Sequence, residues 1–168
     1  MVTLPLLTGI ALLLYTPLSL LSRKLFAFFR KFLGTLENEV VMMDIRKPIL
    51  FFCAGGLAYV GLELLWRGHS HISMFLAGGT CFLLLGKLNK VKPRLPFLLR
   101  GCMGALVITQ VELLAGLLFN RGYTVWDYRN TPVNFFGQIC LPYCLLWIPL
   151  SLIAMWLYDR LDTQLERK

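Results

Sequence analysis

Five long apolar segments recur along the chain and are separated by polar stretches. They cover residues 2–21, 49–66, 72–88, 101–119 and 135–157. A helix that crosses the hydrocarbon core of a bilayer needs about 20 mostly apolar residues, and each segment approaches that length. The pattern predicts an all-α integral membrane protein, in which the last four segments form a four-helix transmembrane core and the first adds an N-terminal fifth hydrophobic segment.

Residues 23–40 show a different pattern, in which apolar and charged side chains occupy opposite faces of a helix. Leu25, Phe29, Phe32 and Leu36 share one face. An amphipathic helix of this kind lies in the membrane interface rather than across it. The expected domain division is residues 1–42 for the hydrophobic segment and the interfacial helix, 43–160 for the transmembrane core, and 161–168 for a cytoplasmic tail.

Composition agrees with this interpretation, because 57% of the residues are hydrophobic and only 15% are charged. A soluble domain has about 25% charged residues, so a soluble single-core protein is excluded, as are a disordered chain and a disulfide-stapled secreted domain. The five cysteines all lie inside apolar runs and form no CxxC pair. Their pattern is typical of small apolar side chains rather than of metal ligands, and no cofactor is expected.

The formal net charge of +8 reflects basic residues that sit between the apolar segments. Segment 23–48 holds six Lys or Arg residues, the 67–71 turn one, the 87–100 loop five, the 120–134 loop two and residues 160–168 three. The positive-inside rule then predicts a multi-pass protein of the cell membrane with a cytoplasmic C-terminus. The charge fits anionic lipid headgroups, and no nucleic-acid motif accompanies it.

Two carboxylates, Glu63 and Glu112, lie inside predicted spans, where an ionisable side chain is expensive and marks a functional site. The predicted topology puts both at a similar depth in the outer half of the membrane, together with Asn134 and Gln138, which are four residues apart and would share one face of the last helix. The expected binding residues of an outer polar pocket are Glu63, Arg67, His71, Glu112, Trp126, Asp127, Tyr128, Asn134 and Gln138. The alternative is that the same residues form a structural hydrogen-bond network between helices.

Several catalytic and nucleotide-binding motifs are absent from the sequence. Gly86-Lys87 lacks the remaining residues of a Walker A motif, and no HExxH, GxSxG or Rossmann fingerprint occurs. No catalytic residue is therefore assigned, and any ATPase that works with this chain has to be a separate protein.

Two stretches carry a family resemblance: residues 59–79, YVGLELLWRGHSHISMFLAGG, and residues 111–147, where VELLAGLLFN is followed by VWDYRNTPVNFFGQICLPYCLLW. They resemble a family of small bacterial membrane proteins, the type IV ABC-transporter (CmpB-like) family, over about residues 43–160. The matching positions are Glu63, Trp66, Arg67, Gly68, His71, Gly78, Gly79, Glu112, Gly116, Trp126, Asp127, Tyr128, Asn134, Gly137 and Gln138. His69 departs from the pattern, which weakens a two-histidine metal site.

The resemblance implies transport, so the leading hypothesis is a transporter subunit or small permease with a polar pocket in the outer half of the membrane. One alternative is a membrane-embedded enzyme acting on a lipid or lipid-linked substrate, with a glutamate as general base and His71 or Arg67 holding an anionic headgroup. Another is a structural or regulatory partner without a ligand. Expected partners are the lipid bilayer and either further copies of the chain or a separate membrane or ATPase subunit.

Overall fold

The chain divides into two compact units, Met1–Met43 and Asp44–Lys168, in a computed structural model that describes residues 27, 30–31, 45–91 and 95–167. Nearly all of the described residues belong to the second unit. The predicted hydrophobic segment at residues 2–21 lies outside the described residues, and so does nearly all of the interfacial helix predicted over residues 23–40.

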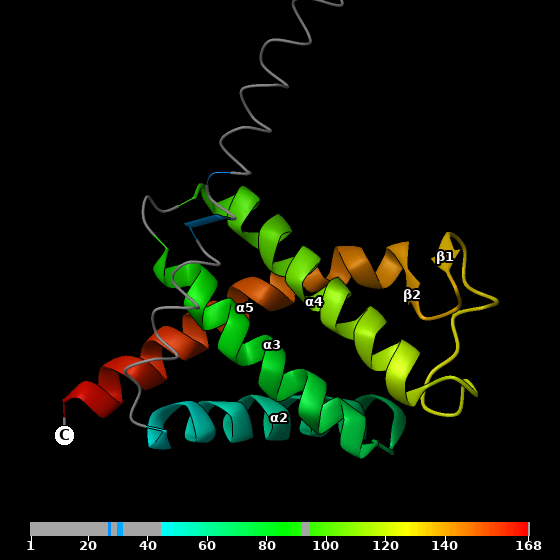
Figure 1. Ribbon diagram of the computed structural model, residues 1–168, viewed down its shortest axis with the longest axis horizontal. Coiled ribbons are helices and arrows are strands. Elements are labelled where there is room, and N and C mark those ends of the chain that lie inside the picture. The colour runs from blue at the N-terminus through cyan, green and yellow to red at the C-terminus, as the bar shows by residue number, and fades with distance from the viewer. Residues whose placement is uncertain (1–26, 28–29, 32–44, 92–94, 168) are drawn as a thin grey trace, which may run out of the picture. The chain divides into compact units, whose positions relative to one another are not determined.

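The second unit contains four long helices (Figure 1). They are α2 (Arg46–Arg67), α3 (Ile72–Lys90), α4 (Phe97–Phe119) and α5 (Leu141–Glu166). Each is long and apolar enough to cross a membrane. The prediction of an all-α core whose four helices are long and apolar enough to cross a membrane is therefore confirmed.

The start of the fifth predicted span was wrong, because residues 134–140 form a small hairpin instead of helix. Strands β1 (Asn134–Phe135) and β2 (Ile139–Cys140) pair antiparallel, and Gly137 between them has a φ of +62°. Glycine adopts this left-handed conformation without steric cost. Helix α5 begins only where Pro142 falls in its first turn, a position that suits proline because the first N–H groups of a helix have no helical acceptor.

Helix α5 also extends beyond residue 157, where the predicted fifth segment ends, and it contains a proline. It runs on to Glu166, so residues 161–166, predicted as tail, are helical. Pro149 lies inside the helix and has no N–H to donate to the carbonyl of Leu145. Such a break is tolerated in membrane helices when neighbouring groups satisfy the freed carbonyl.

Helix α3 lies at the centre of the unit and packs against the other three helices (Figure 1). Helix α2 runs along α3, and α5 runs along α4. Because the chain reverses at each connection, the 68–71 turn and the 120–140 loop gather at one end, here called the loop end. The opposite end, where Lys47, Lys90 and Asp162 lie, is called the basic end.

Ion pairs and contacts between aromatic rings hold the basic end together. The ammonium groups of Lys47 and Lys90 each lie 2.5 Å from the Asp162 carboxylate, so α2, α3 and α5 meet at one buried acid. One layer inward, the ring of Tyr158 lies 4.4 Å from that of Phe51 and 5.4 Å from that of Phe82, measured between centroids. These contacts fix the distance between α2 and α5 at this end.

Small residues let α2 and α3 approach closely. A Cβ atom added to Gly79 would lie 2.6 Å from the carbonyl oxygen of Phe52, and one added to Gly78 would lie 2.5 Å from the Cβ of Tyr59. A Cβ atom added to Gly55 would likewise clash with the Cβ of Phe82. Glycines at helix contacts let backbones approach where no hydrophobic force drives association between helices.

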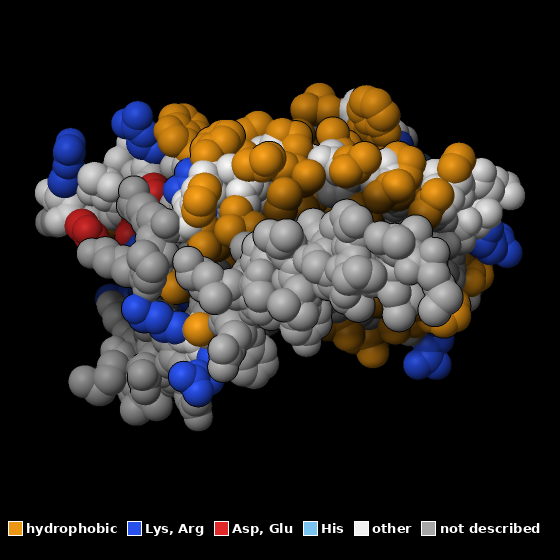
Figure 2. All heavy atoms as spheres, turned by 90° about the horizontal axis from the view of Figure 1, so that it is seen from above, with side chains coloured by type: hydrophobic (Ala, Val, Ile, Leu, Met, Phe, Trp, Pro, Cys, Tyr) orange, Lys and Arg blue, Asp and Glu red, His pale blue; other side chains and the backbone are white. Residues whose placement is uncertain are grey.

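The outer surface of the unit is apolar over its middle. Leu57, Leu65, Leu106 and Ile153 are each at least half exposed. Figure 2 shows hydrophobic side chains across the middle of the described surface, with Lys and Arg side chains toward its two ends. This distribution matches a protein surrounded by lipid chains at mid-height and by headgroups and water at both ends.

The close contact between α2 and α3 predicts opposite effects of two glycine substitutions. Gly79→Ala would force its methyl against the Phe52 backbone and is expected to lower the free energy of unfolding by about 1–3 kcal/mol. Gly61→Ala on α2 meets no atom within 4 Å and should raise it by up to about 1 kcal/mol through helix propensity. Unfolding of both full-length variants in mixed detergent micelles would measure this, and equal effects would contradict a tight contact.

Candidate functional site

Glu63 and Arg67 tie the end of α2 to the 120–134 loop. The Arg67 guanidinium donates to the Glu63 carboxylate, and its other terminal nitrogen donates to the carbonyl of Val125 at 2.7 Å. Ser70 Oγ donates to the second Glu63 oxygen at 2.5 Å. The Glu63 side chain keeps only 12% of its surface exposed. Both oxygens of the Glu63 carboxylate therefore accept hydrogen bonds from nearby residues at the loop end.

Asn120, Gln138 and Trp126 form a second group that shapes the 120–140 loop. The Asn120 side-chain amide donates to the carbonyl of Trp126 at 2.6 Å and to Gln138 Oε1 at 3.0 Å, and its oxygen accepts from the Val125 N–H at 2.9 Å. Gln138 Nε2 donates to the Asn120 carbonyl at 3.1 Å. The Trp126 indole N–H donates to the Gln138 carbonyl at 2.8 Å. Asn120, with no exposed surface, thus organises the loop in place of regular secondary structure.

Asp127 and Arg129 lie on the surface of the same loop. The Arg129 guanidinium binds the Asp127 carboxylate at 2.7–3.0 Å, and this side-chain hydrogen bonding lowers the pKa of Asp127 to about 2. The acid is therefore ionised at neutral pH. Any stability from the pair is complete above the ordinary pKa of an aspartate and is lost progressively as the pH falls from there through about 2.

Asn134 and Gln138 do not share a helical face, which corrects the prediction made from their spacing. Asn134 lies in β1, is exposed, and donates to the carbonyls of Arg129 and Thr131 at 3.2 and 2.9 Å. Gln138 lies in the turn before β2 and is buried. The physical reason is the hairpin at residues 134–140, which replaces the first turns of the predicted span.

Glu112 on α4 is held by two aromatic donors from different parts of the chain. Tyr128 Oη in the loop donates to one carboxylate oxygen at 3.1 Å, and Trp147 Nε1 on α5 donates to the other at 3.0 Å. The Tyr128 ring stacks on Tyr143 with centroids 4.9 Å apart. Both donors are neutral groups. Among the described residues, no basic side chain is hydrogen-bonded to this carboxylate.

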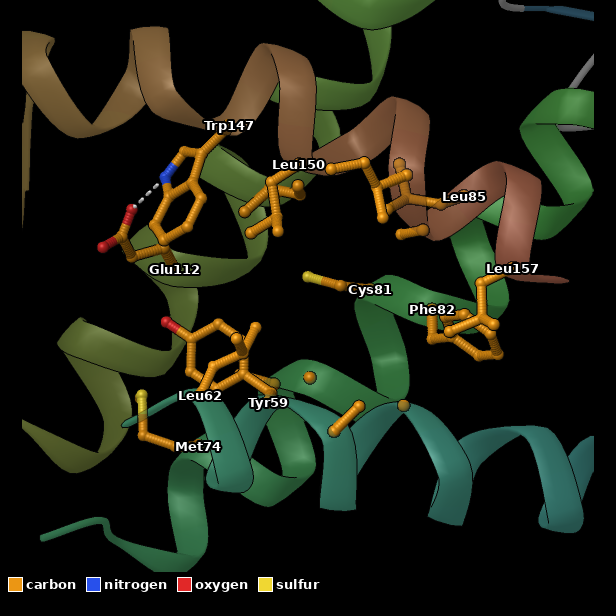
Figure 3. A pocket seen from close by; sticks show the side chains of 17 residues that line it. Tyr59, Leu62, Met74, Cys81, Phe82, Leu85, Glu112, Trp147, Leu150 and Leu157 are labelled. Atoms are coloured by element: carbon orange, nitrogen blue, oxygen red, sulfur yellow. Dashed lines mark hydrogen bonds between the residues drawn. The ribbon is translucent and has the colours of Figure 1, made fainter. Parts of the chain in front are cut away.

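A cavity of about 150 Å³ lies beside Glu112, between α2 and α5 (Figure 3). Its wall is almost entirely hydrocarbon. The polar groups on it are Glu112, the Tyr59 hydroxyl, the Cys81 thiol and the Trp147 indole. Figure 3 shows the Tyr59 hydroxyl on the side of the cavity where Glu112 lies, and Cys81 pointing in from α3.

The cavity opens outward between α2 and α5. Its lining includes Leu62 on α2 and Ile153 and Leu157 on α5, which are 50%, 58% and 37% exposed. The two helices meet at the basic end through Phe51 and Tyr158, and the cavity begins where they separate toward the loop end. A molecule could therefore reach Glu112 from the side of the bundle.

The predicted site residues separate into several groups. Glu112 lines the cavity, Tyr128 donates to Glu112 from the 120–134 loop, and Trp126 donates to the carbonyl of Gln138 at the loop end. Glu63 and Arg67 pair with each other and are not among the lining residues. His71 caps the start of α3, where its Nδ1 accepts from the Ser73 N–H at 3.1 Å. The cavity is consequently more apolar than the pocket expected from sequence.

Sequence reasoning missed three residues around Glu112: Tyr59, Cys81 and Trp147. Tyr59 precedes Glu63 by one helical turn, so its spacing was the available signal. Trp147 lies in an apolar run without any polar neighbour that would mark it. In the described part of the chain, no group of three or more His, Cys, Asp or Glu side chains could hold a metal ion.

Comparisons with known proteins add one finding. Residues 68–167 match the model of a family described as "Putative ABC-transporter type IV". The match covers α3, α4, α5 and the 120–140 loop, and therefore includes Glu112 and both of its hydrogen-bond donors. Searches of curated proteins and of solved structures gave no match.

The hydrogen bonds of Glu112 predict an order of stability among substitutions. Glu112→Leu strands the Tyr128 and Trp147 donors and should cost about 1–3 kcal/mol of unfolding free energy for each. Glu112→Gln keeps one acceptor oxygen and should cost less. Trp147→Phe removes a single donor and is the matched control. Thermal unfolding in detergent would rank the three, and equal melting temperatures for the Leu and Gln variants would contradict the arrangement.

The two ion pairs of the loop end should differ in importance. Arg67→Met leaves the mostly buried Glu63 without its cation and Val125 without its donor, so we expect a loss of at least about 2 kcal/mol of unfolding free energy. Arg129→Met removes an exposed pair and should change stability little. Chemical denaturation of both variants would test this. A larger loss for Arg129→Met would show that Arg67 does not anchor the loop.

Proposed function

The chain belongs to the family described as "Putative ABC-transporter type IV", and on that basis we propose that it is the membrane-embedded subunit of a transporter. Its cavity would receive an amphipathic molecule directly from the bilayer. Glu112 would bind the polar head of that molecule. The observation that carries the proposal is a carboxylate placed in an otherwise hydrocarbon cavity that opens between two lipid-facing helices.

The chemistry of the cavity suggests the class of ligand. A carboxylate accepts hydrogen bonds and attracts cations, and Tyr59 adds a hydroxyl on the same side. The remaining wall offers only apolar contact. An apolar chain therefore fits if it carries a head that donates hydrogen bonds, such as an ammonium or a hydroxyl group. An anionic head would instead lie against the Glu112 carboxylate, which has no proton donor to offer it when ionised.

The size of the cavity supports lateral entry. At about 150 Å³ it is smaller than the pockets of about 300–1,000 Å³ that enclose drug-sized ligands. It would accommodate the head and the first part of a chain, while the rest remains among the lipids. Exposed Leu62 and Ile153 at the opening are compatible with a chain that passes between α2 and α5.

The depth of Glu112 follows from the proposed topology. The positive-inside rule assigns the basic end to the cytoplasm and the loop end to the outside. Glu112 lies seven residues before the last residue of α4, which at 1.5 Å per residue is about 10 Å below the loop end. The head of a bound molecule would then lie in the outer half of the membrane.

Transport would require partners. The sequence has no Walker A motif, so ATP hydrolysis would come from a separate subunit, and the basic end is the part of this chain that would face it. The described core has four helices, which is small for a complete permease, and we therefore propose that it works with further copies or with another membrane subunit.

The alternatives fit the geometry less well. A membrane-embedded enzyme acting on a lipid would need Glu63, Glu112 and His71 around one cavity, and of these only Glu112 lines it. A purely structural role accounts for Asn120, Gln138 and the Glu63–Arg67 pair. It does not account for a carboxylate beside a cavity that opens to the membrane.

Photo-crosslinking would test the proposal. The full-length protein in phosphatidylcholine nanodiscs would be irradiated with diazirine-bearing long-chain amine, alcohol and carboxylic acid of equal chain length. We expect the amine or alcohol to label cavity residues such as Met74 and Leu150. Glu112→Gln should reduce labelling by the amine about tenfold, because a charge-assisted hydrogen bond becomes a neutral one.

The controls distinguish the site from its surroundings. Glu63→Gln should leave labelling unchanged, since Glu63 does not line the cavity. Equal losses for both variants would mean that the two carboxylates act together. Equal labelling by the carboxylic acid, or labelling that Glu112→Gln does not reduce, would contradict the proposed role of Glu112.

A further inference from the structure

A second feature of α4 concerns the face turned away from the cavity. Gln110 lies near the middle of the helix and is exposed. Its amide makes no hydrogen bond to any other residue of the described part of the chain. Ile108 and Glu112 line the cavity. Each is two residues from Gln110 along α4, so both point to the opposite side of the helix from Gln110.

An amide in this position needs a partner from outside the unit. The hydrocarbon core holds no water, so a polar side chain that faces lipid at mid-span remains unsatisfied. Glutamine side chains inside membranes instead form hydrogen bonds between helices. The exposed face of α2 provides a contrast, because Leu57, Leu65 and Trp66 on it are suited to lipid or to the interface.

The leucines around Gln110 have the spacing of a helix–helix contact. Leu106, Gln110, Leu113 and Leu117 follow each other at intervals of four, three and four residues. Leu106 and Leu117 are 53% and 46% exposed. Apolar residues at this 3.5-residue period form the seam of two helices that wrap around each other, and one polar residue in the seam sets its register. We call these four residues the α4 seam.

We infer that the α4 seam joins two copies of this chain as a parallel homodimer, with Gln110 of each copy hydrogen-bonded to Gln110 of the other. All copies insert in the same orientation, so the same residue of two copies lies at the same depth. A primary amide has both donors and an acceptor, so two of them can pair reciprocally about a two-fold axis. A second copy therefore supplies the complementary group at the required height.

The dimer leaves the cavity accessible. The seam lies on the side of α4 opposite to Ile108 and Glu112, and the cavity opens between α2 and α5. Two cavities would thus face away from the shared contact. The inference is independent of what the cavity binds.

The test uses the full-length purified protein in liposomes, with no other protein present. Single-molecule photobleaching at a series of protein-to-lipid ratios would give the association constant. We expect Gln110→Leu to weaken association about tenfold, which is the loss of about 1.4 kcal/mol of interhelical hydrogen bonding. Gln110→Asn, which keeps the amide, should retain part of it. Leu57→Ala on α2 is the control and should change nothing.

Oxidative crosslinking provides a second measurement that does not depend on affinity. Gln110→Cys should form a disulfide dimer, and Leu57→Cys at similar depth on α2 should not. A monomer at all ratios, association unaffected by Gln110→Leu, or equal crosslinking of both variants would overturn the inference. If Gln110→Cys were protected from a lipid-soluble maleimide even in the most dilute samples, the chain's own N-terminal residues would cover the seam. That result would also overturn the inference.

Discussion

The cost of an unpaired polar group in hydrocarbon determines most of this structure. Three polar side chains toward the loop end find specific partners: Glu63 has Arg67 and Ser70, Glu112 has Tyr128 and Trp147, and Asn120 has Gln138. Because the partners of Glu112 and Asn120 come from other parts of the chain, satisfying these polar groups also fixes where the elements lie. The loop after α4, which has little regular secondary structure, is held in this way.

The two ends of the helical unit solve the same problem differently. At the basic end, full charges meet, and Asp162 receives the ammonium groups of two lysines from two other helices. At Glu112 the donors are neutral aromatic groups. The negative charge of Asp162 is already neutralised by two lysines, so this carboxylate has little electrostatic attraction left for a further cation. A carboxylate held by a phenol and an indole is hydrogen-bonded to no cation among the described residues and is the better anchor for a ligand.

The spans were predictable because a run of about 20 apolar residues in a membrane has few alternatives to a helix. The hairpin at residues 134–140 was not, since its Phe and Ile residues continue the apolar run and only Gly137 marks the turn. The importance of Glu112 could be inferred from the cost of burying it. Its donor Trp147 could not, because the two residues are 35 positions apart and nothing in the local sequence links them. The separation of Glu63 from the cavity depends on a hydrogen bond from Ser70 and a carbonyl of the loop, which only the folded chain brings together.

Pro149 gives α5 an uneven stiffness along its length. Its missing N–H falls between Trp147, on the cavity wall, and Asp162, which is anchored at the basic end. Bending a helix strains its backbone hydrogen bonds, and at this point one of them is not made. In mechanical terms α5 is a lever whose fixed arm is held by Lys47 and Lys90 and whose free arm carries a donor of Glu112. A displacement of the free arm would move Trp147 relative to Glu112 without disturbing the anchor.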